Sequence, residues 1–299
     1  MKVIRFYETG SPEVLRYEDI PTPEPGPKEV LVHNIAIGVN LVDISRRSGK
    51  APLPPGSSMP FTPGGESAGT IESLGADVTE FQLGEQVLVR GGAPGYSEFT
   101  VATANQVYRI PPGLDPVEAS TIATTFFTAW GVLVNSAKLQ RGETILIHSC
   151  AGGVGSALVQ VAKHIGATVI GTSSQDSKLE WAKEFGMDHS VNYSTQDFVH
   201  EVAVLTEGKG VQVVADGVGG ETTVKSLKSL QRGGRLVIYG VSGGSRTAEF
   251  ILPELWFANH TIIGGSGNVS RIDAESILAR FSDGTFRSVV DKTWPLSEA

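Results

Sequence analysis

Three glycines lie between an apolar run typical of a buried strand and an amphipathic helix. The run HSCAGGVGSALVQVAKHIG begins at His148 and places Gly152, Gly153 and Gly155 in the turn. In a strand–turn–helix unit, backbone N–H groups and the positive end of the helix bind a pyrophosphate, which any Cβ would hold away. Cys150 occupies the first position of the G-x-G-x-x-G pattern, so the motif is imperfect. The order strand, turn, helix, second strand favours dinucleotide binding over a turn that serves packing alone.

The end of the next strand, GTSSQDSK, bears on which dinucleotide is bound. Sites for NAD usually carry Asp or Glu at this tip, to hold the ribose 2′-hydroxyl. Here Ser174 stands at the tip, Lys178 follows it, and Tyr193 comes just after the third strand. Hydrogen-bond donors and positive charge suit a 2′-phosphate, so the sequence predicts NADPH. Asp176 is a nearby charge that opposes this prediction, and the alternatives for Lys178 and Tyr193 are a solvated helix residue and a packing aromatic.

Other kinds of catalytic site find little support in the sequence. The six histidines include no pair at i, i+4 spacing, and one cysteine cannot build a multi-thiolate site. We interpret each histidine as a surface or packing residue and predict no metal site. Neither a Y-x-x-x-K pair nor a G-x-S-x-G nucleophile motif is present. The simplest prediction is hydride transfer, in which the cofactor does most of the chemistry and the protein holds the geometry.

Composition limits the class of protein. The chain has 299 residues, more than the roughly 100–200 of one domain, which favours two domains that share a cleft. A net charge of −8 argues against a general nucleic-acid or anionic-membrane surface. No run of about 18 apolar residues and no signal-like N-terminal segment is present. With a single cysteine, this predicts a soluble cytoplasmic protein.

The elements that must position these residues fall into three stretches. Residues 1–122 contain short strand-like runs separated by turn signals, which predicts an antiparallel, barrel-like domain; residues 53–66 are interpreted as a long ordered loop. Residues 123–264 alternate strand and helix, which predicts an α/β domain with the doubly wound parallel sheet of the Rossmann type. In residues 265–299, AESILARFSDG is predicted to be a helix and VVDKTWPL (289–296) a strand.

Several segments together resemble a known family. GVNLVDISRRSG (38–49), TPGGESAGTIESLG (62–75) and the AGGVG turn are similar to the zinc-free quinone oxidoreductase and zeta-crystallin branch of the medium-chain dehydrogenase/reductases. The resemblance implies a GroES-like catalytic domain, residues 1–122 with 265–299, and a Rossmann NADP-binding domain, residues 123–264. Zinc alcohol dehydrogenases of this superfamily carry Cys and His where this chain has Asn40 and Gly65, which agrees with the prediction of no metal site.

The resemblance also assigns site residues. It implies that Asn40 lines the nicotinamide and substrate side of the cleft, that Asp43 braces this loop, and that Thr128 contacts the nicotinamide end. Loop capping for Asn40 and helix packing for Thr128 are the alternatives. The residues that the resemblance assigns to the cofactor are Gly152, Gly153, Val154 and Gly155 at the pyrophosphate, Ser174, Lys178 and Tyr193 at the 2′-phosphate, and Tyr239, Gly240 and Ser242 farther along the chain.

The function expected from these features is NADPH-dependent, zinc-independent hydride transfer to a quinone or a related conjugated carbonyl compound. Reduction of 2-enoyl or alkenal double bonds, alcohol oxidation, and a crystallin-like binding role remain alternatives. Tyrosines that some members carry after the GVN-x-x-D segment are replaced here, which favours a more anionic or larger acceptor; the replacing residues are Ser45, Arg46, Arg47, Lys50 and Ala51.

Two further expectations concern the end of the chain and its association. Family members continue beyond DKTWPLSEA for a helix and a closing strand, so we expect the first domain to lack a strand and to expose an unpaired edge. The apolar run FILPELWFANHTIIGG (250–265) is predicted to form a homodimer contact, with burial inside one chain as the alternative.

Overall fold

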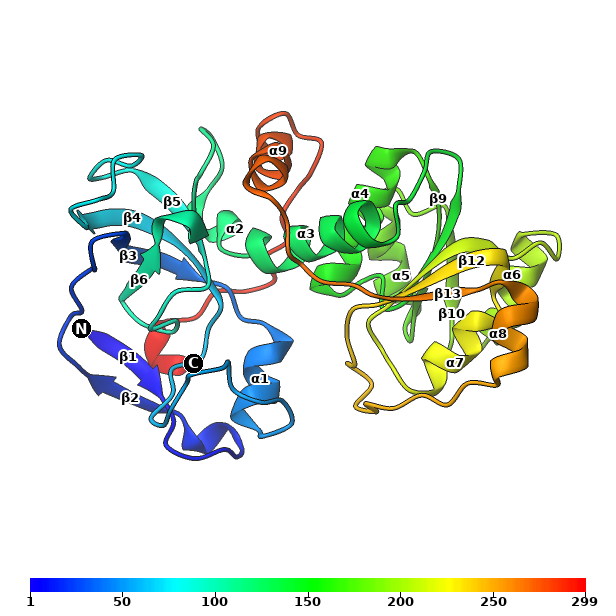
Figure 1. Ribbon diagram of the computed structural model, residues 1–299, viewed down its shortest axis with the longest axis horizontal. Coiled ribbons are helices and arrows are strands. Elements are labelled where there is room, and N and C mark those ends of the chain that lie inside the picture. Colours follow the sequence, from blue (N-terminus) through cyan, green and yellow to red (C-terminus); the bar gives the residue numbers. More distant parts are fainter. The chain divides into compact units, whose positions relative to one another are not determined.

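The computed structural model describes residues 1–299 (Figure 1). The chain divides into two compact units. The first contains Met1–Thr124 and Arg271–Ala299, and the second contains Thr125–Ser270. The C-terminal segment therefore returns to the unit that the N-terminal half builds.

The first unit is built on antiparallel strands, as the sequence predicts. A five-stranded sheet has the order β6-β3-β4-β5-β7, and β1 pairs with β2 in a separate ribbon. Its core contains Val30, Val32, Ile71, Val87 and Val89. The strands are β1 (Lys2–Arg5), β2 (Arg16–Asp19), β3 (Glu29–Ile37), β4 (Glu66–Leu74), β5 (Gln86–Arg90), β6 (Phe99–Thr103) and β7 (Val107–Arg109).

Short helices connect and complete this unit. The helices are α1 (Leu41–Arg47), α2 (Pro116–Ala119), which is capped by the Asp115 carboxylate, and α9 (Arg271–Ser282). Short 3₁₀ turns span Pro12–Val14, Ala104–Gln106 and Leu296–Glu298. Helix α3 (Ile122–Trp130) runs from the first unit into the second and continues as a π-helical stretch, Gly131–Ser136.

The second unit is a six-stranded parallel sheet of the predicted doubly wound type. Its order is β10-β9-β8-β11-β12-β13, so the order reverses between β8 and β11. The strands are β8 (Thr144–Ile147), β9 (Thr168–Ser173), β10 (His189–Asn192), β11 (Val211–Asp216), β12 (Leu230–Ile238) and β13 (Thr261–Gly264). Ligands bind at the carboxyl ends of strands near such a reversal.

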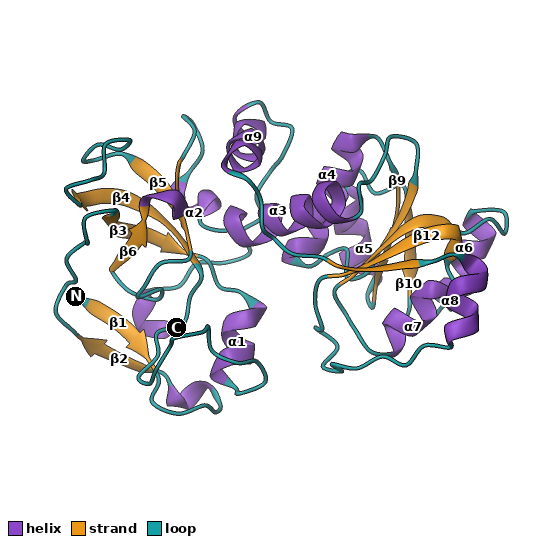
Figure 2. Cartoon of the chain, viewed as in Figure 1, coloured by secondary structure: helices purple, strands orange, loops and turns teal.

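Helices cover both faces of this sheet (Figure 2). Apolar side chains of α6, α7 and α8 join one core with β8, β9, β11 and β12. The strands β8, β9 and β11 are nearly all buried, which is why they read as continuous apolar runs. The helices are α4 (Gly153–Ile165), α5 (Asp176–Lys183), α6 (Phe198–Leu205), α7 (Glu221–Leu227) and α8 (Leu252–Ala258). No helix in the chain combines the length and apolar character needed to span a bilayer.

One predicted strand is wrong, and several elements were not predicted. Residues 289–296 form no strand and pair with no neighbour. Trp294 is 60% exposed there; strand preference mainly reflects packing on a sheet, which this segment lacks. The unpredicted elements include α1, α2, α6, α8, β7 and β13. In α1 the apolar residues Leu41, Val42 and Ile44 stay exposed, so the helix shows no amphipathic period.

Candidate functional site

The glycines of this turn have two different roles: packing requires one of them, and the other two leave open space. Helix α4 begins at Gly153, with Gly152 at the N-cap. A Cβ on Gly155 would lie 2.0 Å from the carbonyl oxygen of Ser149, so packing alone requires glycine there. A Cβ on Gly152 or Gly153 would meet nothing closer than 3.4 Å or 3.3 Å, and the latter contact is with Thr125. Glycine at these two positions therefore leaves open space that packing does not demand.

The same turn presents unused hydrogen-bond donors. The N–H groups of Gly153, Val154 and Gly155 belong to the first turn of α4, where a helix supplies no internal acceptor. None of these three groups donates a hydrogen bond to another backbone group. Together with the space beside Gly152, they form a cradle that fits a diphosphate.

Cys150 explains the imperfect motif. Its thiol is fully buried, and burial raises its pKa to about 12. A Cβ on Gly171, in the neighbouring strand β9, would lie 2.8 Å from the Cys150 Sγ. The side chain therefore packs within the sheet against a glycine, and its presence does not obstruct the cradle.

The predicted 2′-phosphate residues gather at the ends of β9 and β10. Ser173 is the partner of Asn192 across these strands, and the Tyr193 N–H donates to the Ser173 carbonyl oxygen at 3.1 Å. The Ser194 hydroxyl donates to the carbonyl oxygen of Ser174 at 3.1 Å. Ser174 and Tyr193 are thus brought side by side, and the Tyr193 ring is 48% exposed.

Two charged residues on α5 flank this strand end. Lys178 lies in the first turn of α5, is exposed and takes part in no ion pair. Asp176, the charge that opposes a phosphate, accepts a hydrogen bond from the Asn192 amide at 2.8 Å. Its carboxylate is therefore partly occupied by the protein, while the Lys178 ammonium is free for a ligand.

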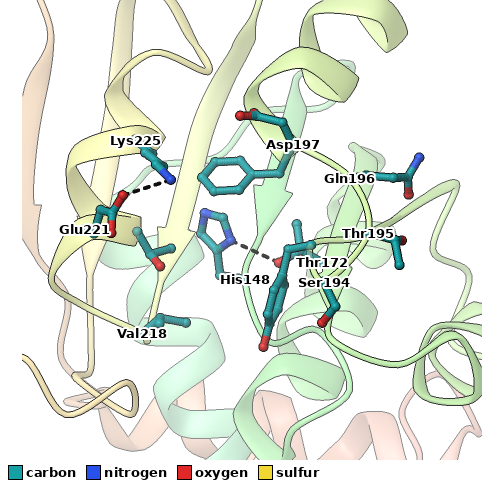
Figure 3. A pocket seen from close by; sticks show the side chains of 12 residues that line it. His148, Thr172, Ser194, Thr195, Gln196, Asp197, Val218, Glu221 and Lys225 are labelled. Atoms are coloured by element: carbon teal, nitrogen blue, oxygen red, sulfur yellow. Dashed lines mark hydrogen bonds and ion pairs between the residues drawn. The ribbon is translucent and has the colours of Figure 1, made fainter.

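A pocket of about 490 Å³ opens at the carboxyl ends of the central strands (Figure 3). Tyr193 is the only predicted cofactor residue that lines it. An ion pair of 2.9 Å joins Lys225 and Glu221 within its wall. The lining residues are His148, Thr172, Tyr193, Ser194, Thr195, Gln196, Asp197, Phe198, Val218, Glu221, Thr222 and Lys225.

A buried histidine lies at the base of this pocket. His148 is 2% exposed, and its Nδ1 lies 3.0 Å from the Thr172 Oγ1 while its Nε2 lies 2.8 Å from the Ser226 Oγ. The Phe198 ring packs edge-on against it at 4.9 Å. Burial lowers the pKa of His148 to about 4, so the ring is neutral at pH 7. The sequence interpretation treated every histidine as a surface or packing residue. It did not predict that His148 forms two hydrogen bonds at the base of a pocket.

Asp216 holds the loop on the other side of the pocket. It is fully buried and accepts hydrogen bonds from the Val218 N–H at 2.7 Å, the Gly219 N–H at 3.2 Å and the Thr223 hydroxyl. Neither His148 nor Asp216 was singled out from the sequence. The available signal was a polar residue directly at the carboxyl end of an apolar strand, in TILIHS and VQVVAD.

The predicted residues Tyr239, Gly240 and Ser242 follow β12 and run alongside the same loop. The Tyr239 N–H donates to the Asp216 carbonyl oxygen at 2.9 Å, and the Ser242 N–H donates to the Gly217 carbonyl oxygen at 2.8 Å. Burial, together with the charges of Asp216 and Cys150, raises the pKa of the Tyr239 hydroxyl. This places Tyr239 near the strand that leads into the glycine turn.

In the first unit, Asp43 ties together the segment that carries Asn40. Asp43 is 3% exposed, and its Oδ2 accepts from the Asn40 N–H at 3.0 Å and the Tyr96 hydroxyl at 3.2 Å. Its Oδ1 accepts from the Gly64 N–H at 3.3 Å. Burial raises the pKa of Asp43 despite these donors. The position of the Asn40 backbone is thereby fixed.

Glu66 orients the Asn40 side chain, and the sequence reasoning did not select it. Its Oε1 accepts from the Asn40 Nδ2 at 2.8 Å and its Oε2 from the Thr124 N–H at 2.8 Å. The side chain is buried at the start of β4, and burial raises its pKa to about 7. An acidic residue that opens an apolar strand, in GGESAGTI, was the available signal.

Thr128 lies in the second unit, whereas Asn40 lies in the first. Thr128 is half-buried on α3. Thr125, three residues earlier and therefore on the same helix face, is the residue nearest to a Cβ on Gly153. This helix face is thus directed towards the glycine turn.

The side chains that bind metals do not gather anywhere in the chain. No group of three or more His, Cys, Asp or Glu residues is arranged to hold a metal ion. The only cysteine is buried and unpaired.

Comparisons with known proteins place this geometry in a family. The model for the alcohol dehydrogenase GroES-like domain matches residues 26–112, and that for zinc-binding dehydrogenase matches residues 153–282. The quinone oxidoreductase of Pseudomonas aeruginosa is 39% identical over 247 residues, which cover 82% of this chain and 75% of that protein. The chain belongs to the quinone oxidoreductase branch of the medium-chain dehydrogenase/reductases. The family and the fold class predicted from the sequence are confirmed.

Two other members extend the comparison over nearly the whole chain. The 2-haloacrylate reductase of a Burkholderia species is 36% identical over 306 residues, which cover 98% of this chain and 92% of that protein. A crystal structure of the Escherichia coli quinone oxidoreductase complexed with NADPH aligns with a TM-score of 0.91 at 30% identity. That alignment covers all of this chain and 94% of the other.

Proposed function

We propose that this member of the quinone oxidoreductase branch is a zinc-independent enzyme that transfers hydride from NADPH to a quinone or a related conjugated carbonyl compound. The observation that carries the proposal is the glycine turn, where Gly152 and Gly153 leave space that packing does not require beside three unused N–H groups. The named activities of the relatives and the NADPH in the Escherichia coli structure support it.

The residues of the chain bind and orient; the bound nicotinamide supplies the hydride. The first turn of α4 binds the diphosphate, and Ser174, Lys178 and Tyr193 bind the 2′-phosphate. Asn40, positioned by Asp43 and Glu66, orients the acceptor, and Thr128 contacts the nicotinamide. We assign no side chain as a general acid, and the proton that completes the reduction comes from solvent.

Lys178 is expected to select NADPH over NADH. Changing Lys178→Ala removes a free cation beside the strand end, so the Kd for NADPH should rise about 10-fold at low salt, and less at high salt. The Kd for NADH should change less than about twofold. Titration calorimetry with both nucleotides measures this. Lys183→Ala, on the same helix but paired with Glu180, is the matched control; an equal loss of both nucleotides in K178A would remove the 2′-phosphate assignment.

The acceptor class is tested by the loss of NADPH absorbance with ortho- and para-quinones, 2-alkenals and activated acrylic compounds. Turnover of quinones supports the main proposal. Preference for the conjugated double bond supports the second candidate, double-bond reduction, which the 2-haloacrylate reductase relative favours. Binding of NADPH with no turnover of any acceptor would contradict both and favour a binding or crystallin-like role.

We also propose that two copies of the chain pair along β13, which lies within the run 250–265 predicted from the sequence to form a homodimer contact. Strand β13 lies at the edge of the parallel sheet, and an unpaired edge is a template for another strand. Trp256 and Phe257 on the preceding α8 are 61% and 70% exposed. The double change Trp256→Ser, Phe257→Ser should convert a dimer into a monomer in size-exclusion chromatography with light scattering.

The control for this pairing is Ile272→Ser, which removes an apolar side chain that is 79% exposed on α9. This variant should keep the mass of the unmodified protein. A monomer before any change would contradict the proposed pairing. The cytoplasmic location predicted from the sequence stays a prediction.

A further inference from the structure

Two arginines in the last turn of α1 carry donors that no protein group satisfies. Arg46 and Arg47 are half-buried, and the Nε of each is buried with no hydrogen-bond partner. Neither guanidinium forms an ion pair or a hydrogen bond. A buried donor without an acceptor is costly, and a basic residue placed there only to complement the helix dipole would keep its donors in water.

The neighbouring acids do not use these cations. The Oδ2 of Asp43 is taken by the Asn40 N–H and the Tyr96 hydroxyl, and its Oδ1 by the Gly64 N–H. Arg46 lowers the pKa of Asp43, yet burial outweighs it and leaves that pKa raised. Glu13, whose pKa is lowered first by a hydrogen bond from Ser11 and also by the charge of Arg47, is exposed and forms no ion pair with that arginine. Neither guanidinium is therefore held by an ion pair with these acids.

These cations stand in the last turn of the helix that Asn40 caps. Arg46 and Arg47 follow Asp43 by three and four residues, so they share its helix face. Asp43 in turn holds the Asn40 N–H at 3.0 Å. The arginines follow Asn40 by six and seven residues, so about 9–10 Å along the helix separates them from that residue. On either side of Asn40 in the chain, Val39 and Leu41 are 69% and 57% exposed, which suits the apolar carbon skeleton of a ligand.

We propose that Arg46 and Arg47 bind a carboxylate of the acceptor, so that the preferred substrate of this enzyme is an α,β-unsaturated carboxylate rather than a neutral quinone. The inference rests on the second candidate of the proposed function, reduction of a conjugated double bond. The planar guanidinium matches the two oxygens of a carboxylate, and it is more weakly hydrated than an ammonium. Both arginines are specificity-determining residues in this assignment.

The reaction gives these charges a role beyond binding. Hydride adds to the β-carbon of the acceptor, the C=C π bond breaks, and its electron pair moves towards the α-carbon and the carboxylate. A proton from solvent then forms the second C–H bond at the α-carbon, and NADPH leaves as NADP⁺. Because the carboxylate is already negative, the added charge is unfavourable unless cations are fixed beside it. The arginines should therefore affect kcat as well as KM.

The test uses a matched pair of acceptors, 2-chloroacrylate and its neutral methyl ester. The readout is the ratio of kcat/KM for the acid to kcat/KM for the ester, from the loss of NADPH absorbance. The unmodified enzyme should favour the acid. Arg46→Met and Arg47→Met should each lower this ratio about 10-fold, and the double variant about 100-fold. Arg16→Met is the control, because Arg16 is exposed in the same unit and stacks on Tyr7; it should leave the ratio unchanged.

A second readout measures binding without turnover of the acid. Saturated 2-chloropropionate should inhibit quinone reduction competitively, and its Ki should rise in the same order as the ratio falls. Arg46→Lys and Arg47→Lys keep the charge, lose the planar fork and should give intermediate values. They serve if the methionine variants lose their fold, as judged by circular dichroism.

The outcomes separate this inference from the proposed function. The carboxylate subsite is overturned if the arginine variants leave the ratio unchanged, or if the unmodified enzyme prefers the ester. In either case, turnover of the ester and of quinones would still support the proposed oxidoreductase function. Failure of acid, ester and quinone alike overturns the proposed function itself.

Discussion

Replacing Gly152 with valine is expected to raise the Kd for NADPH at least about 100-fold while the protein stays folded. The φ and ψ of Gly152, −84° and 171°, are extended values open to any residue, and a Cβ there would meet no protein atom closer than 3.4 Å. The added side chain would instead occupy the space in front of the free N–H groups of α4. Titration calorimetry with NADPH and thermal unfolding of the same sample measure the two effects.

Gly155→Ala is the contrasting variant for this experiment. Its Cβ would lie 2.0 Å from the Ser149 carbonyl oxygen, so the backbone must shift and the unfolding temperature should fall. The two substitutions therefore separate binding from packing within one turn. If G152V binds NADPH as tightly as the unmodified protein, the glycine turn does not bind the diphosphate and the cofactor assignment is lost.

The sequence predicted best those features that a short segment determines alone. The alternation of strand and helix after residue 123, and the glycine turn that opens the first helix of that series, follow from local periodicity and turn chemistry. The resemblance placed the chain in its family, which the comparisons confirm. Even within the glycine turn, however, only the structure distinguishes Gly155, which packing requires, from Gly152 and Gly153, which it does not.

Features that depend on distant partners could not be predicted. Asn40 and Glu66 are 26 residues apart, and His148 and Ser226 are 78 apart; no local pattern links either pair. The wrong strand at 289–296 has the same origin, because a strand needs a neighbouring edge that the segment cannot specify. The arginines of α1 were noted in the sequence, but the absence of partners for their Nε atoms appears only in the folded chain.

Changing Glu66→Gln is expected to remove a pH-dependent contribution of about 3 kcal/mol to the free energy of unfolding. Burial raises the pKa of Glu66 from 4.5 to about 7. The folded state therefore holds a proton that the unfolded chain releases, so this contribution to stability is complete below about pH 4.5 and is lost as the pH rises through about 7. Glutamine cannot ionise. The free energy of unfolding of E66Q should therefore increase relative to that of the unmodified protein as the pH rises from about 5 to about 8.

Denaturant unfolding at these two pH values measures the difference, with Glu72→Gln, an exposed position on the same strand, as the control. The free energy of unfolding of E72Q should differ from that of the unmodified protein by the same amount at both pH values. If the difference for E66Q is constant as well, Glu66 has the same pKa in the folded state as in the unfolded chain.

The same change should alter catalysis through the amide of Asn40. The Thr124 N–H is fixed in the backbone, so the introduced glutamine must turn its oxygen to that N–H and its NH₂ to Asn40, which then rotates to accept with Oδ1. Protonated Glu66 demands the same rotation, which frees the Asn40 Nδ2 to donate to an acceptor carbonyl. We therefore expect kcat of the unmodified enzyme to fall about 10-fold as the pH rises through about 7. E66Q should keep its low-pH value at about pH 8, whereas parallel pH profiles for the two proteins would show that Glu66 does not set the orientation of Asn40.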